Sequence, residues 1–182
     1  MQKIHIETER LLLREIDLLD VQDINEYASD IEVTKFTVWG PNSIEETKMF
    51  IREVLKNQNI ESRTDYDFGI VLKETNKLIG TGSIIIDDLN NKKSSMGYCI
   101  NKKFWGKGYG TELLRGMKKL SFNILNLHRI YALVDPENIG SIRVLEKAGM
   151  IREGLLREHR FQKGKWRNSI LYSMLEQEYV DS

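Results

Sequence analysis

The sequence predicts a mixed α/β fold in which helices cover both faces of one central sheet. Three observations lead to this prediction. Segments of alternating apolar residues are interspersed with segments of helical spacing, turn residues separate them, and a glycine-rich loop joins a strand to a helix. The chain has 182 residues, which suffices for a buried core, so we expect a single domain over residues 1–182.

The N-terminal half is expected to contain a strand, two helices and a three-stranded meander. Asp17 stands where an N-cap is preferred, ahead of apolar residues at helical spacing. Pro41 breaks the chain, and Ser43 with Glu46 then forms a capping-box pattern before the second helix. Alternation predicts the strands that follow. The expected ranges are a strand at 6–16, a helix at 17–30, a helix after Ser43, and strands at 66–72, 78–87 and 94–101.

The C-terminal half is expected to contain a helix, a strand, a helix and a closing hairpin. Pro136 ends the strand, Asn138 starts the last helix and Gly149 stands where a helix stops. Lys163-Gly164 predicts the hairpin turn. The ranges are a helix at 111–124, a strand at 129–135, a helix at 138–148, and strands at 150–161 and 166–175. The sheet would thus have about seven strands.

The loop Phe104–Gly110 carries glycine at every second position and opens directly into a helix. Glycine lets the backbone approach a ligand closely, and the unpaired N–H groups of a helix N-terminus bind anions. The loop lacks the Walker pattern, and Thr111 occupies the third glycine position of a dinucleotide fingerprint. A ligand-free glycine-rich hairpin is the alternative, but a helix follows here. We interpret the loop as a cradle for a pyrophosphate.

Composition limits the partners. Lys and Arg total 27, as do Asp and Glu, so no net basic charge would attract nucleic acid. The single cysteine, Cys99, cannot form an internal disulfide, which fits a cytoplasmic protein. No apolar run has the length of a signal peptide or a membrane span. We expect a cytoplasmic protein with no nucleic-acid or membrane partner and no bound metal.

Five segments together carry a family resemblance. They are Thr8-Glu9-Arg10-Leu11-Leu12-Leu13-Arg14, Gly97-Tyr98-Cys99-Ile100, Trp105-x-x-Gly108-x-Gly110, Leu127-His128-Arg129-Ile130 and Asn138-x-x-Ser141-x-x-Val144-Leu145-Glu146-Lys147-x-Gly149. In this order they resemble the GCN5-related N-acetyltransferases (GNAT), and within them the RimJ/RimL type that acetylates ribosomal-protein N-termini. The resemblance implies a mostly antiparallel sheet with a splayed pair of central strands. It also implies direct acetyl transfer from acetyl-CoA to a primary amine.

The resemblance also assigns residues to acetyl-CoA. Backbone amides of the loop would hold the pyrophosphate, and the edge of the third meander strand would pair with the pantetheine arm. The loop residues are Trp105, Gly106, Lys107, Gly108, Tyr109, Gly110 and Thr111, and the strand residues are Tyr98, Cys99 and Ile100. Trp105 stands where the family often has Gln or Arg. A backbone N–H near Tyr98 would polarise the thioester carbonyl, although sheet packing also explains Tyr98 and Ile100.

Several side chains have two interpretations. Cys99 is better explained as a small core residue than as a nucleophile, because the family transfers directly. Asn138 can cap a helix, and in the family its side chain also reaches the pantetheine. Ser141 would meet the CoA sulfur and protonate the departing thiolate, or it is a surface serine.

The general base is assigned to Glu158, with a solvated surface carboxylate as the alternative. His159 lies next to Glu158 and would face the opposite side of the strand. In the branch an acidic residue is expected near Arg160, and Glu158 is preferred because alternation places it on the same face of the strand as Arg160. Asn168 stands where the branch often has Asp. The segment Trp39-Gly40-Pro41 would line the acceptor groove or staple the second helix.

The leading hypothesis is an acetyl-CoA-dependent N-acetyltransferase that acts on a protein N-terminal amine, such as that of a ribosomal protein. The alternatives are acetylation of a small amine (a polyamine, amino acid or drug) and a non-catalytic acetyl-CoA-binding module. Acceptor and oligomeric state, a homodimer included, stay open.

Overall fold

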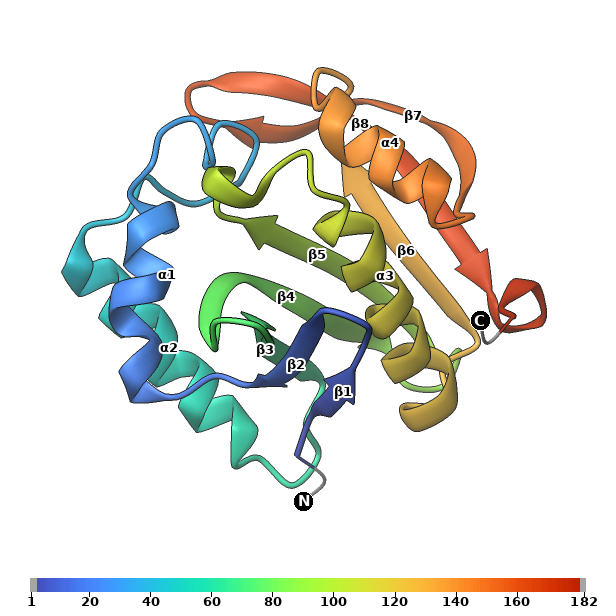
Figure 1. The fold of residues 1–182 in the computed structure, drawn as a ribbon. Coiled ribbons are helices and arrows are strands. Elements are labelled where there is room, and N and C mark those ends of the chain that lie inside the picture. Colours follow the sequence, from blue (N-terminus) through green and yellow to red (C-terminus); the bar gives the residue numbers. More distant parts are fainter. Residues whose placement is uncertain (1–2, 181–182) are drawn as a thin grey trace.

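The computed structural model describes residues 3–180. Over this range eight strands form one sheet in the order β1-β2-β3-β4-β5-β6-β8-β7, and the β5–β6 pair is parallel while the other pairs are antiparallel (Figure 1). The strands are β1 (His5–Glu7), β2 (Leu11–Glu15), β3 (Asp65–Leu72), β4 (Lys77–Asp88), β5 (Lys93–Ile100), β6 (Arg129–Val134), β7 (Ile151–Gln162) and β8 (Lys165–Leu175). The mixed, mostly antiparallel sheet is confirmed.

Two helices cover each face of the sheet, as predicted (Figure 1). On one face α1 (Val21–Ala28) and α2 (Ile44–Gln58) bury Ile24 and Ile51 in one cluster with Leu78 of β4. On the other face α3 (Tyr109–Lys119) and α4 (Ile139–Lys147) contribute Leu113 and Leu145 to a larger cluster with the opposite side chains of the sheet. Burial of these apolar stripes holds the layers together. None of the helices in residues 3–180 is long and apolar enough to cross a membrane.

The N-terminal segment forms two strands instead of the one expected over residues 6–16. β1 and β2 pair as a hairpin in which His5 faces Arg14, and this adds the eighth strand. The turn is closed by the Thr8 N–H, which donates to Leu11 O at 2.9 Å. The Thr8 hydroxyl and the Arg10 N–H of the turn also donate to Glu112, a residue far along the sequence. Apolar alternation alone could not reveal this turn.

The predicted caps are present. Ser43 and Glu46 form a reciprocal capping box at α2, and the Asn138 side chain accepts from the Ser141 N–H at α4. Asp17 caps a short 3₁₀ turn, η1 (Leu18–Asp20), which precedes α1. Gly149 follows α4 at φ +80°, a conformation that favours glycine.

The helix after the glycine loop begins at Tyr109, two residues earlier than expected, and its last part, Leu120–Ile124, is π-helical. Gly110 therefore lies inside the first helical turn. A Cβ at Gly110 would stand 3.1 Å from Val144 Cγ2 of α4. Glycine at this position thus permits the close approach of α3 and α4.

The central strands β5 and β6 separate, which confirms the splayed pair. Their parallel register covers Lys93–Ser95 opposite Arg129–Tyr131, at the N-terminal ends of both strands. Past β5, the Asn101 N–H donates to Ile79 O on the β4 side at 2.8 Å. Because backbone polar groups alternate along a strand, those of Ile100 and Tyr98 point to the other side, into the gap.

Candidate active site

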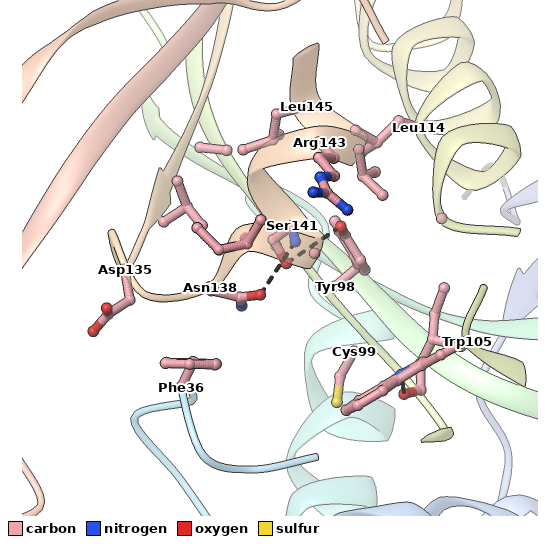
Figure 2. Close-up of a pocket in the computed structure, with 18 of the residues that line it drawn as sticks. Phe36, Tyr98, Cys99, Trp105, Leu114, Asp135, Asn138, Ser141, Arg143 and Leu145 are labelled. Carbon is pink, nitrogen blue, oxygen red and sulfur yellow. Dashed lines mark hydrogen bonds between the residues drawn. The ribbon is translucent and has the colours of Figure 1, made fainter. Parts of the chain in front are cut away.

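A cavity of about 810 Å³ occupies the gap between β5 and β6 (Figure 2). Its walls come from the loop after α1, from β5 and the glycine loop, and from β6 and α4. Eleven of the residues predicted to contact acetyl-CoA line it. They are Tyr98, Cys99, Ile100, Trp105, Gly106, Gly108, Tyr109, Gly110, Thr111, Asn138 and Ser141.

Lys107 is not in the lining. Its carbonyl accepts a hydrogen bond from Arg10 Nη1 at 3.1 Å, and its ammonium lies 5.4 Å from the centre of the Phe104 ring. The neighbouring lysines are also engaged, since Lys102 pairs with Asp30 at 2.7 Å and Lys103 with Glu26 at 2.6 Å. We therefore do not assign anion binding at this loop to its lysine side chains.

The backbone of the loop does fit a phosphate. Gly106 and Gly108 have φ of +74° and +82°, and Gly108 is the N-cap of α3 without a side chain to satisfy the first-turn N–H groups. A Cβ built on Gly106 would meet nothing within 4 Å, so space for a ligand exists there. Unpaired amides at the positive end of the helix dipole suit a diphosphate.

Three polar side chains meet across the gap. The Tyr98 hydroxyl donates to Ser141 Oγ at 3.4 Å, and the Ser141 N–H donates to Asn138 Oδ1 at 3.1 Å (Figure 2). Burial raises the pKa of Tyr98, so the phenol keeps its proton and can donate it in a hydrogen bond. Asn138 lines the cavity while it caps α4, so the capping role leaves its amide NH₂ for another partner.

Cys99 and Ile100 differ from Tyr98 in the groups that they present to the cavity. Cys99 is 8% exposed and belongs to the core cluster under α1 and α2. Burial raises the pKa of its thiol to about 12, which favours the core interpretation over a thiolate nucleophile. Ile100 O accepts from the indole Nε1 of Trp105 at 2.7 Å. That carbonyl thus already accepts a hydrogen bond, so Ile100 offers only its N–H in the gap, whereas Tyr98 offers both its N–H and its carbonyl.

Glu158 lies outside the cavity lining. It is exposed, it has φ +48°, and the β7–β8 register shifts between Leu156 and Arg160. The simple alternation that placed Glu158 and Arg160 on one face therefore does not apply here. The Glu158 N–H donates to Asn168 Oδ1 at 2.8 Å, and His159 Nδ1 lies 3.2 Å from Ser169 Oγ.

The loop after α1 lines the cavity through different residues from those expected. Trp39-Gly40-Pro41 is absent from the lining, which instead includes Lys35, Phe36 and Thr37. Two hydrogen bonds join this loop to the β7–β8 turn, from Lys163 Nζ to Thr34 O and from Gln162 Nε2 to Thr37 O. The hairpin and the loop thus flank the same mouth of the cavity.

Sequence reasoning also missed charged residues of the lining. Asp135 and Glu137 both pair with Arg167, at 2.6 and 2.9 Å, and Arg167 lowers the pKa of Glu137. The position of Asp135 at the end of a predicted strand was an available signal. Arg143 lies two residues after Ser141 on α4, and its place on a predicted helix could have identified it.

Comparison with known proteins decides the family. The sequence profile of the acetyltransferase (GNAT) domain matches residues 10–151. The chain belongs to the GNAT acetyltransferase family. Acetyl-CoA is accordingly its cosubstrate, and its chemistry is acyl transfer to an amine. Over residues 3–180, no three His, Cys, Asp or Glu side chains are grouped to hold a metal ion.

Three relatives in this family are informative. The chain is 34% identical to the uncharacterized N-acetyltransferase p20 of Bacillus licheniformis, over 95% of this chain and 97% of that protein. A proposed ribosomal-protein-serine acetyltransferase from Vibrio cholerae is 26% identical, with a TM-score of 0.80 over 94% of this chain and 97% of that one. Spermidine N-acetyltransferase from Vibrio cholerae, solved with CoA and spermine, is 25% identical, with a TM-score of 0.79 over 94% and 98%.

Proposed function

We propose that this GNAT protein transfers the acetyl group of acetyl-CoA to the α-amine of a protein N-terminal residue. The choice of acceptor rests on one observation: the residues that line the cavity offer no histidine and no unpaired carboxylate that could act as a general base. Its lining contains no histidine, and its three carboxylates, on Glu32, Asp135 and Glu137, are all ion-paired. Such a site suits an amine that has an appreciable neutral fraction without the help of a protein base.

The α-amine meets this condition better than other primary amines. Its pKa is about 8, against about 10.4 for a lysine side chain, so its neutral fraction at pH 7 is more than about 200-fold larger. A neutral amine can attack the thioester directly, and water can accept the proton that is released. The missing base is therefore no obstacle to acetylation of an N-terminus.

Roles follow for the lining residues. Amides of Gly106 to Thr111 bind the diphosphate, and the Tyr98 N–H polarises the thioester carbonyl. Ser141 Oγ, which lies 3.4 Å from the Tyr98 hydroxyl, protonates the departing thiolate of CoA. Asn138 holds the first turn of α4 and offers its amide to the pantetheine arm.

Acetylation of a polyamine is the second candidate, favoured by the similarity to spermidine N-acetyltransferase. A polyamine carries several ammonium groups, which carboxylates without another cationic partner would attract most strongly. Those of the lining are paired, and Lys35 at the same mouth has an aromatic contact with Phe36 and no ion pair in residues 3–180. A non-catalytic module is the third candidate, since Arg160 and Asn168 replace expected acidic residues. Arg160 and Asn168 both lie outside the cavity lining, so these replacements do not alter the lining itself.

The test is release of CoA thiol from acetyl-CoA with matched acceptors. One peptide has a free N-terminus and no lysine; its twin is N-terminally blocked and carries one internal lysine; spermidine and free amino acids complete the set. We expect turnover with the first peptide, rising through about pH 8 as the α-amine loses its proton. Turnover confined to spermidine or free amino acids would reject the N-terminal acceptor, and none with any amine would favour the binding module.

A further inference from the structure

Arg10, in the turn between β1 and β2, is joined to the glycine loop although 97 positions separate it from Lys107. Its Nη1 donates to Lys107 O at 3.1 Å, and its guanidinium carbon lies 4.5 Å from the centre of the Tyr109 ring. Its Nε donates to Glu112 Oε2 at 2.7 Å. Arg10 thus contacts the loop, the first residue of α3 and the first turn of that helix.

Glu112 is the anchor of this arrangement. It is 6% exposed, and its Oε1 accepts from the Arg10 N–H and from Thr8 Oγ1, both at 2.6 Å. Burial raises the pKa of Glu112, but the hydrogen bonds from Thr8 and Arg10 outweigh burial and leave it below its usual value. A buried carboxylate with this many donors is held rigidly.

The contact with Lys107 O fixes an amide that matters for the ligand. The carbonyl of Lys107 and the N–H of Gly108 belong to one trans peptide, so they point in opposite directions. With the carbonyl directed at Arg10, the Gly108 N–H is directed away from Arg10. Gly108 lines the cavity, whereas Arg10 and Lys107 do not.

We propose that Arg10 is a positioning residue, which orients the Gly108 amide and the start of α3 for the diphosphate of CoA without contacting CoA itself. This inference rests on the proposed role of the glycine loop. Residues 105–108 are exposed, so few contacts within the loop would maintain its left-handed conformation. Loss of the Arg10 contact would leave the Lys107–Gly108 peptide free to rotate.

The test compares Arg10→Gln with Arg14→Gln. Arg14 lies on the adjacent strand β2 and, like Arg10, pairs with a carboxylate and stays outside the cavity lining, but its hydrogen bonds go to Glu15 and Asp20 and not to the glycine loop. We expect the dissociation constant of CoA, measured by calorimetry, to rise roughly tenfold in Arg10→Gln and to stay within about twofold in Arg14→Gln. The KM for acetyl-CoA should rise in parallel, with kcat and the KM for the amine nearly unchanged.

S-acetylpantetheine, which lacks the diphosphate, separates positioning from general damage. Its turnover should be the same in Arg10→Gln and in the unaltered protein. The double variant Arg10→Gln/Glu112→Gln leaves no unpaired carboxylate at position 112 and is used if the single variant does not fold. Equal CoA affinity in the Arg10 and Arg14 variants, or equal losses with acetyl-CoA and S-acetylpantetheine, would overturn the inference. Failure of the unaltered protein to bind CoA would instead overturn the proposed loop function.

Discussion

Replacement of Gly108 by alanine tests the cradle directly. Gly108 has φ +82°, where a residue with a Cβ is disfavoured by about 1–2 kcal/mol. A Cβ there would stand 3.4 Å from Arg10 Nη2, which is an ordinary contact, so the cost comes from the backbone. Because the loop is exposed, the unliganded variant can relax to negative φ and must return to bind CoA. We therefore expect the dissociation constant of CoA to rise roughly 5- to 30-fold.

Gly164 supplies the matched control. It has φ +79° in the β7–β8 turn, nothing lies within 4 Å of its added Cβ, and it does not line the cavity. Gly164→Ala should destabilise the backbone by a similar free energy, about 1–2 kcal/mol. Each kcal/mol of lost stability lowers the Tm by about 2–4 °C. Its CoA affinity should stay within about twofold of the unaltered protein. Calorimetry and thermal unfolding measure both effects, and equal CoA affinity in the two variants would refute the cradle.

Three further outcomes are expected. Ser141→Ala should lower kcat with acetyl-CoA at least about tenfold while the dissociation constant of CoA changes less than about threefold, because general-acid assistance is lost and the amides remain. Equal turnover would remove Ser141 from the mechanism. Glu158→Gln should leave the pH–rate profile superimposable, since Glu158 is exposed outside the cavity lining, and a shift of the profile toward higher pH would restore Glu158 as the base. Asp67→Asn should stabilise the protein at pH 7 and change little near about pH 4, because burial raises the pKa of Asp67 to about 6 and the folded state is penalised as pH rises through that value. Thermal unfolding across pH checks this, and a difference that does not grow with pH would contradict it.

The features that the sequence predicts well depend on near neighbours. The Ser43–Glu46 box and the Asn138 cap join residues three positions apart, so their hydrogen bonds can be inferred from spacing. Gly108 has φ +82°, a conformation that favours glycine, so the glycine in the sequence indicates it.

Features that depend on partners distant in the sequence cannot be predicted from local spacing. The β1–β2 turn donates hydrogen bonds to Glu112 of α3, and the lining carboxylate Asp135 is paired with Arg167, 32 positions away. Glu158 shows the other difficulty, because a register shift in β7 removes the alternation on which its assignment depended. In each case the deciding contact lies in another element, and its position follows from the packing of the whole sheet.

The N-terminal turn and the glycine loop are best understood as one unit. The turn has hydrogen bonds of its own between Thr8 and Leu11, and contacts between the two segments add to them. Glu112 satisfies the polar groups of the turn, and Arg10 of the turn holds the Lys107 carbonyl. A mutation in β1 that shifts this turn should therefore weaken CoA binding, although no residue of β1 lines the cavity. The two segments are linked directly, by Arg10 with Lys107 O and the Tyr109 ring, and through the buried carboxylate of Glu112.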